Sequence, residues 1–348
     1  MKRLVPVLGA LVLVAAVVAI VVWQRPDSKA ALDPSGDVVL QYADGSQLWR
    51  MGDPETPVTM QVAAELSAKG VSLEQLRKDG GAIVVTTIDR RAQNGAAEVI
   101  RTVSAGEPAS LRYSISAVDP NNGAVKAYSP GNDPAFDYAG GVLKEPGSAF
   151  FPFAAVAAQQ TGKKLEEVGN ESVVHAARQA GVPETVVVGG KETKLFGDET
   201  KVRPFDLAAA YATLAAEGLR RDAHFVTHVT DVNGTTLYRA ETKGVPAFDP
   251  DPRRSKDIAN LVTAALRGDA VCGRVPSDIA CRHGEWRFEQ GRVGHAWMVT
   301  YSPRISVSVF VGSAQPGTPA VDRDGNAVTG PGLPDRLWDE FEQKLTQW

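Results

Sequence analysis

The stretch that decides the fold of this 348-residue sequence is Pro146-Gly147-Ser148-Ala149-Phe150-Phe151-Pro152-Phe153. A serine follows a Pro-Gly turn and opens an apolar helix, so its side chain can serve as a nucleophile or as a helix N-cap. A serine hydroxyl attacks an acyl carbon efficiently only when a neighbouring group takes its proton. Phe151, one helical turn after Ser148, cannot accept a proton. The N-cap interpretation is therefore favoured.

Patterns on both sides of this stretch predict mixed α and β structure. Residues 114–128 read as two strands joined by a Pro-Asn-Asn-Gly turn, and residues 226–238 as a second hairpin around Asn233-Gly234. Residues 205–219 form an Ala-rich run that ends at a glycine, as a helix does. Residues 334–348 place apolar side chains at helical spacing and predict a terminal helix that packs on a sheet.

The stretch around Ser148 resembles the Pro-Gly-Ser-x-Phe-Lys-Pro-Phe segment of the penicillin-binding proteins, whose Ser-x-x-Lys motif places a serine and a lysine on one helix face. Residues 80–94, 114–128, 205–219 and 295–312 resemble, in order, further segments of that family's transpeptidase domain. The resemblance spans residues 60–348. It implies an α+β fold of the serine D,D-peptidase/β-lactamase-like type, with an antiparallel sheet flanked by helices.

All three active-site motifs of that family are altered in this sequence. Phe151 replaces the lysine of the first motif, and no Ser-x-Asn lies between Phe153 and Val173. The nearest counterpart of the third motif, Lys-Thr-Gly, is Arg282-His283-Gly284, whose arginine can still pair with a carboxylate. The resemblance therefore implies a degenerate domain in which Ser148 occupies the nucleophile position without activity and Arg282-His283-Gly284 is a remnant ligand-binding motif.

Two functions from different classes follow from this resemblance. The favoured one is a non-catalytic binding or scaffold role in peptidoglycan and cell-wall biogenesis, with peptidoglycan peptides, β-lactams or cell-wall synthesis proteins as partners. The alternative is an active serine D,D-transpeptidase, carboxypeptidase or penicillin-binding enzyme that uses Ser148 with a different base, such as His283. A third possibility is a likeness of architecture alone, since fold does not fix function. Outside such a role, His283 and His295 are expected to be polar surface residues.

The N-terminal segment predicts a membrane anchor. Leu4 to Trp23 is an uncharged run of 20 residues, long enough as a helix to span a hydrocarbon core of about 30 Å. Lys2 and Arg3 precede it, which favours a cytoplasmic N-terminus and an extracytoplasmic remainder in a single-pass cell-membrane protein. A cleaved signal peptide is the rival interpretation.

The predicted organisation has three parts. Residues 1–25 are the N-terminus and anchor, residues 26–60 an extracytoplasmic linker with at most a short strand pair over 38–42 and 47–51, and residues 61–348 the transpeptidase-like domain. The segment before residue 61 is too short for the glycosyltransferase domain of the bifunctional penicillin-binding proteins.

The two cysteines and the net charge restrict the kinds of ligand that the protein is expected to bind. Cys272 and Cys281 are the only cysteines, and an extracytoplasmic location favours a disulfide between them over a metal site, for which a second ligand pair is missing. Closing this short loop is expected to stabilise the fold by about 2 to 3 kcal/mol. A net charge of −4 without a basic cluster excludes a nucleic-acid binder. No cofactor or metal is expected.

Overall fold

The computed structural model describes residues 36–133, 135–184, 200–267, 276, 278–288 and 291–346. The predicted membrane anchor, Leu4 to Trp23, lies outside these residues. Among the helices within the described ranges, none is both long enough and apolar enough to cross a membrane.

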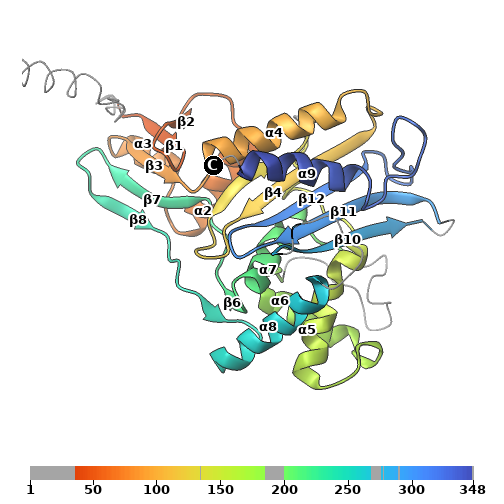
Figure 1. The fold of residues 1–348 in the computed structure, drawn as a ribbon. Helices are drawn as coiled ribbons and strands as arrows, with labels where there is room; N and C mark the ends of the chain where they lie inside the picture. The colour runs from red at the N-terminus through yellow and green to blue at the C-terminus, as the bar shows by residue number, and fades with distance from the viewer. Residues whose placement is uncertain are drawn as a thin grey trace, which may run out of the picture.

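A five-stranded antiparallel sheet forms the centre of the molecule (Figure 1). Its order is β10 (Ala280–Arg287), β11 (Val293–Tyr301), β12 (Ser306–Ser313), β4 (Leu111–Val118) and β5 (Val125–Ser129). The β4–β5 pair confirms the hairpin predicted over residues 114–128. Its turn requires Gly123, because φ is +81° and a Cβ there would lie 2.5 Å from the Asp222 carbonyl oxygen.

Helices cover both faces of this central sheet. One face, here called the α4–α9 face, carries α4 (Arg90–Ser104) and α9 (Leu333–Thr346). The other, the α5–α7 face, carries α5 (Phe151–Thr161), α7 (Pro204–Ala215) and α8 (Pro252–Arg267), with α6 (Asn170–Ala180) against α5 and α7. Every residue of β11 and β12 is buried as a result.

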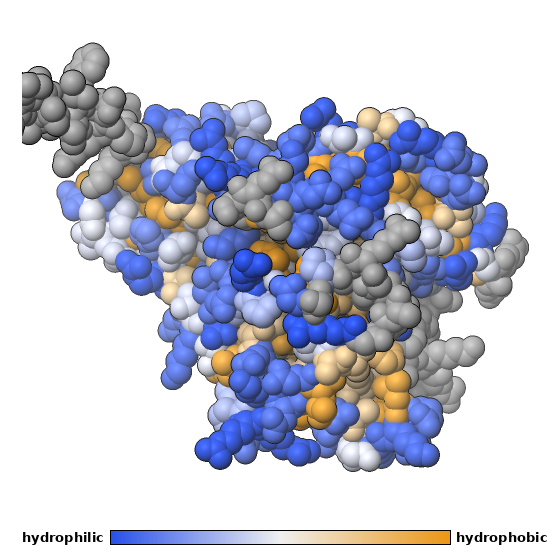
Figure 2. All heavy atoms as spheres, viewed as in Figure 1, coloured by the Kyte–Doolittle hydropathy of each residue, from blue (hydrophilic) through white to orange (hydrophobic). Residues whose placement is uncertain are grey.

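Strand alternation assigns side chains to these two faces. On β11, Trp297 and Val299 join the core under α5 and α7, whereas Ala296 and Met298 join the core under α4 and α9. The visible surface is mostly hydrophilic, and apolar residues gather in its lower part, over α5, α6 and α8 (Figure 2).

A second five-stranded sheet packs beside the first. Its order is β2 (Gln47–Arg50), β1 (Val38–Gln41), β3 (Ala82–Thr86), β7 (Val226–Asp231) and β8 (Thr236–Arg239), with α2 (Pro57–Ala68) and α3 (Leu73–Lys78) against it. A short ribbon joins β6 (Leu219–Arg220) to β9 (Val245–Pro246). Because β1 is buried and pairs in parallel with β3, residues 38–60 belong to the folded body, not to the linker expected over residues 26–60.

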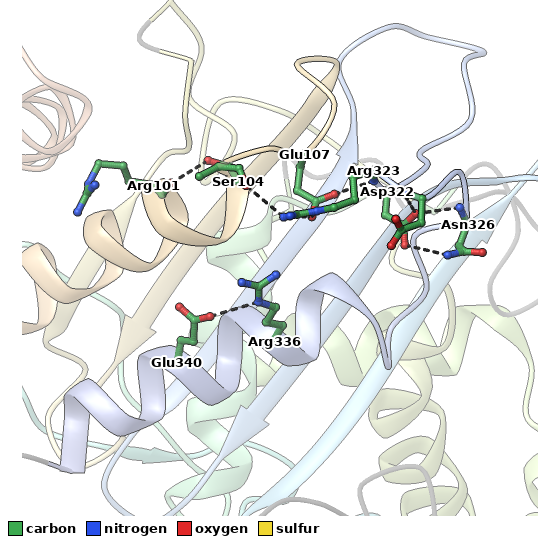
Figure 3. Close-up of polar contacts among 10 residues, drawn as sticks. Arg101, Ser104, Glu107, Asp322, Arg323, Asn326, Arg336 and Glu340 are labelled. Carbon is green, nitrogen blue, oxygen red and sulfur yellow. Dashed lines mark hydrogen bonds and ion pairs between the residues drawn. The ribbon is translucent and has the colours of Figure 1, made fainter.

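Polar contacts attach the loop before α9 to the end of α4 (Figure 3). The side chain of Glu107 is only 3% exposed, and its carboxylate accepts hydrogen bonds from the main-chain N of Arg323 at 2.9 Å and from its Nε at 2.7 Å. Arg323 also donates to the Ala105 carbonyl at 3.1 Å. The Arg336–Glu340 pair on α9 is instead a solvated ion pair at 3.2 Å. The contacts of the buried Glu107 carboxylate with Arg323 therefore hold the loop, whereas the Arg336–Glu340 pair lies on the solvent-exposed surface of α9.

Candidate functional site

Ser148 lies in η1 (Gly147–Phe150), a short 3-10 helix that leads directly into α5. The residue at the N-cap of α5 is Phe150, and that of η1 is Pro146. The N-cap interpretation of Ser148 is therefore wrong. Its Oγ donates a hydrogen bond to the main-chain carbonyl of His283 at 2.8 Å, on β10. The extra turn before α5 places the hydroxyl against the sheet and away from the free N–H groups that a cap would bind.

The backbone of η1 lies directly against β10. A Cβ at Gly284 would come 2.2 Å from the carbonyl oxygen of Pro146 and 2.8 Å from the Cβ of Ala149. A Cβ at Gly147, whose φ is +52°, would come 2.2 Å from the carbonyl oxygen of Glu285. Neither position can accept a side chain without moving main chain. The two glycines therefore permit the contact that holds Ser148 on β10.

Phe151 and Arg282 stack on each other beside Ser148. The Cζ of Arg282 lies 4.5 Å from the centroid of the Phe151 ring, and its Nε donates to the Ser148 carbonyl at 3.3 Å. A guanidinium over an aromatic face is a stabilising cation–π contact. Phe150 and Phe153 differ from Phe151, because both are buried in the core, edge to face at 4.8 Å. The helix position one turn after Ser148 thus holds an aromatic ring covered by a cation.

The imidazole of His283 belongs to the opposite face of the sheet. Its Nε2 lies 2.5 Å from Oδ1 of Asp335 on α9, and a Cβ at Gly330 would lie 2.6 Å from the His283 Cβ. His283 is 6% exposed, so the surface position expected for it is wrong. Its Nδ1 is buried without a hydrogen-bond partner among the described residues. His283 thus meets Ser148 through its main chain, while its ring is bonded to α9.

Glu145 and His295 form a buried polar contact just before η1. The main-chain oxygen of Glu145 accepts hydrogen bonds from Nε2 of His295 at 2.8 Å and from Nε1 of Trp297 at 2.9 Å. The Glu145 carboxylate lies 3.4 Å from Nζ of Lys201 and 3.6 Å from Nε2 of His295. His295 is 3% exposed and stacks on Trp286, so the surface position expected for it is also wrong.

Burial lowers the pKa of two groups near this segment, His295 and Lys144. It lowers the pKa of His295 to about 3, which keeps the ring neutral at pH 7. Burial also lowers the pKa of the Lys144 amine, against the opposing effect of Glu145. Lys144 forms a two-way backbone bridge with Val202 at 2.9 Å, and no hydrogen bond joins it to Ser148 within the described part of the chain. In the sequence, the signal for the contact between Glu145 and His295 is the position of His295 within the apolar strand β11.

The predicted disulfide lies partly within the described residues. Cys281 is fully buried and disulfide-bonded. Cys272 lies outside the described residues, so the pairing stays a prediction. Within the described ranges, no group of three or more His, Cys, Asp or Glu side chains is placed to hold a metal ion.

Comparison with known proteins places this geometry in a family. Penicillin-binding protein 1A of Mycobacterium tuberculosis is 31% identical over 352 residues, which cover 82% of this chain and 42% of the relative. The structure of the penicillin-binding protein PonA1 from Mycobacterium tuberculosis matches with a TM-score of 0.73 at 28% identity, over 83% of this chain and 91% of that one. Its complex with penicillin V matches with a TM-score of 0.70 over 83% and 92%. No family model matches the chain.

The matches cover most of this chain, but less than half of the length of the curated relatives. The chain spans about two fifths of the length of the curated relatives it matches, 42% of one and 44% of another. The solved structure is matched over nearly its whole length, and the α+β fold expected from the sequence is confirmed. By sequence and by fold, the described part of the chain is a transpeptidase domain of the penicillin-binding protein family.

Proposed function

We propose that this protein is a membrane-anchored component of the bacterial cell envelope whose transpeptidase domain acts by binding in peptidoglycan biogenesis, without acyl-transfer catalysis. One observation carries the proposal. The Ser148 hydroxyl donates to a main-chain carbonyl, and the position one turn later holds Phe151 under the Arg282 guanidinium. A carbonyl oxygen, a phenyl ring and a guanidinium are all unable to take the serine proton at neutral pH.

The loss of general-base catalysis supports a binding role. Proton transfer by a positioned base contributes roughly 10²- to 10⁴-fold to a reaction rate. Without it, acylation of Ser148 is slow on the scale of cell-wall synthesis. What remains is an ordered surface in which Arg282 and the Ser148 segment are held on β10, where a peptide or a partner protein can bind without being cleaved.

The alternative is an active enzyme with a base from elsewhere in the chain. Solved structures favour testing it, since the relative PonA1 is known in complex with penicillin V, and a protein of the same fold forms a penicillin G acyl-enzyme. His283, the base considered from sequence, is a poor candidate because its ring is bonded to Asp335 on the α4–α9 face. An active enzyme would therefore need a rearrangement that brings another base to Ser148.

Covalent labelling separates the two functions. The full-length chain in detergent is incubated with a fluorescent penicillin, beside a Ser148→Ala variant and beside penicillin-binding protein 1A of Mycobacterium tuberculosis as a positive control. We expect no Ser148-dependent adduct by gel fluorescence or intact mass after hours of incubation, while the positive control is labelled. An adduct that disappears in Ser148→Ala contradicts the proposal.

The membrane location is tested separately. Cells expressing the full chain, or a chain lacking residues 1–25, are fractionated and probed for the protein. We expect the full chain in the membrane pellet and the shortened chain in the soluble fraction. Recovery of the full chain in the soluble fraction would contradict the anchor.

A further inference from the structure

Three asparagines of the chain are followed by glycine, and the proposed function uses none of them. They are Asn94-Gly95 on α4, Asn122-Gly123 in the turn between β4 and β5, and Asn233-Gly234 in the turn between β7 and β8. Glycine has no Cβ, so its main-chain nitrogen is unshielded from the side chain that precedes it. An asparagine in this position can convert to an aspartyl residue without an enzyme.

The conversion is an exchange of bonds without oxidation or reduction. The main-chain nitrogen of the glycine attacks Cγ of the asparagine, the new N–Cγ bond closes a five-membered imide ring, and the bond from Cγ to Nδ2 breaks. Ammonia leaves and takes the proton of the main-chain N–H. Water then opens the ring at either carbonyl, which gives aspartate or isoaspartate and one added negative charge at neutral pH. The rate depends on how readily the local main chain opens to bring the nitrogen onto Cγ.

The helix α4 holds the first pair. Asn94 is exposed, but Gly95 is buried under α9, and a Cβ on Gly95 would lie 3.2 Å from Cβ of Lys344. Within a 15-residue helix, each main-chain nitrogen after the first turn donates to the carbonyl four residues earlier. The nitrogen of Gly95 can therefore reach Cγ of Asn94 only if this turn unwinds and α9 moves away.

The turn between β4 and β5 holds the second pair. The buried Gly123 donates its N–H to the carbonyl of Asp119 at 2.8 Å, and a Cβ on Gly123 would lie 2.5 Å from the carbonyl oxygen of Asp222. The side chain of Asn122 is also fixed, because its Oδ1 accepts a hydrogen bond from the main-chain N of Ala124 at 2.8 Å. This turn can open only if it separates from the segment before β7.

The turn between β7 and β8 leaves the third pair open to solvent. Residues 232–237 are all exposed, and apart from its chain neighbours nothing lies within 4 Å of a Cβ placed on Gly234. The hydrogen bonds of the turn are internal to it. The N–H of Gly234 donates to the Asp231 carbonyl at 3.0 Å, and Oδ1 of Asp231 accepts from the main-chain N of Asn233 at 2.9 Å and of Thr235 at 2.7 Å. Because β8 is the edge strand of its sheet and the hairpin projects from the body (Figure 1), this turn can open while the core stays folded.

We propose that Asn233 is a site of spontaneous deamidation in the folded protein, and that the fold protects Asn94 and Asn122. The new carboxylate lies in the same turn as that of Asp231, so two like charges come together there. Isoaspartate also lengthens the main chain by one atom in a hairpin whose register depends on its turn. One added negative charge changes the formal net charge from −4 to −5.

Peptide mapping of the incubated protein tests the proposal. The folded full-length chain in detergent is kept at pH 8 and 37 °C, beside the same chain unfolded in guanidinium chloride, and the mass gain of deamidation is followed in the three peptides. In the folded chain we expect Asn233 to convert at least 10-fold faster than Asn94 or Asn122. In the unfolded chain we expect similar rates at the three sites, since glycine follows each of them.

Two variants show that the turn sets the rate. Asp231→Ala removes the acceptor of two main-chain hydrogen bonds of the turn and should speed the conversion of Asn233 at least twofold, while Asn94 and Asn122 keep their rates. Asn233→Gln has one more methylene, which disfavours the five-membered ring, and should remove the mass gain from its peptide. Equal rates at the three sites in the folded chain, no conversion of Asn233 in the time that converts the unfolded chain, or an unchanged rate in Asp231→Ala would overturn the proposal.

Discussion

Along β10, Arg282 and Gly284 face the Ser148 segment, whereas Cys281 and His283 face the helices α4 and α9. On the first face the contact is main chain against main chain, with no side chain between Gly284 and η1. On the second it is made by side chains, including the pair between His283 and Asp335. Neighbours in one sequence motif thus serve different cores, because successive side chains of a strand point to opposite faces.

The two faces of β10 differ in how far they can adjust to a substitution. A main-chain contact has no rotamers to rearrange, so an added atom must displace a whole segment. A side-chain pair can lose one partner and relax, or exchange it for water at the surface. Substitutions on the Ser148 side should therefore be costlier than substitutions on the α4–α9 side. Unfolding measurements on variants of both faces test this order.

The largest effect is expected for Gly284→Ala. The new methyl group would meet the carbonyl of Pro146 at 2.2 Å, and we expect a loss of about 3 kcal/mol in the free energy of unfolding. Urea denaturation measures it. Gly169→Ser is the matched control, since Gly169 caps α6 at φ −75° with nothing within 4 Å, and serine is a good cap there. A cost below 1 kcal/mol for Gly284→Ala would mean that η1 yields easily.

The next effect is the pH dependence carried by His295, also on the Ser148 side. Its pKa is about 3 in the fold, below the ordinary 6.5. Between these two pH values the unfolded chain binds a proton on this histidine that the folded chain does not bind. Stability from the neutral ring is fully present above pH 6.5 and falls by about 1.4 kcal/mol per pH unit below it, or about 2 kcal/mol at pH 5.

His295→Gln removes this titration and keeps a donor for the Glu145 carbonyl. We expect urea unfolding between pH 7.5 and pH 4.5 to show a shallower loss of stability in this variant than in the parent. The exposed His175 provides the control, and His175→Gln should keep the parental slope. Identical slopes for His295→Gln and the parent would show that His295 is not the group responsible.

A smaller effect is expected on the α4–α9 side for Glu107→Gln. The Glu107 carboxylate is almost fully buried, whereas the Arg323 side chain is 42% exposed and can turn to water when its partner loses charge. We expect a loss of about 1.5 kcal/mol, typical of a hydrogen bond to a charged group. Thermal or urea unfolding measures it. A cost as large as that of Gly284→Ala would remove the distinction between the two faces.

The smallest effect is expected for Arg336→Gln, in the solvated pair with Glu340 on α9 (Figure 3). Pairs of this spacing on a helix surface contribute about 0.3 to 0.5 kcal/mol, and salt screens them. We expect a change of that size at low ionic strength, which disappears in 0.5 M salt. A larger, salt-insensitive change would show that Arg336 has a structural role beyond this pair.

The parts of the fold that sequence predicts well are those with local signals. The hairpin over residues 114–128 carries its own turn, and the helix at residues 205–219 carries an Ala-rich run with a glycine at its end, which the structure confirms as β4–β5 and α7. The α9 helix follows from apolar side chains at helical spacing. In each case neighbouring residues determine the conformation.

The arrangement of the candidate site depends on distant pairing, and sequence predicts it poorly. Ser148 follows a Pro-Gly turn, as a serine at a helix N-cap often does. Its hydroxyl nevertheless donates to a carbonyl 135 residues away, on a strand whose position depends on the whole sheet. The orientation of His283 depends on which side of β10 the η1 segment packs. His295 is buried because helices cover both faces of its strand, which one strand's pattern does not reveal.

The stack of Arg282 on Phe151 also constrains how this domain can change over generations. A lysine substituted at position 151 alone would place an ammonium where the guanidinium now rests, 4.5 Å from the ring centre, and like charges at that range repel. A neutral residue at position 282 alone would leave the ring of Phe151 uncovered. Each replacement therefore weakens this contact until the other has occurred, so the two positions are expected to change together.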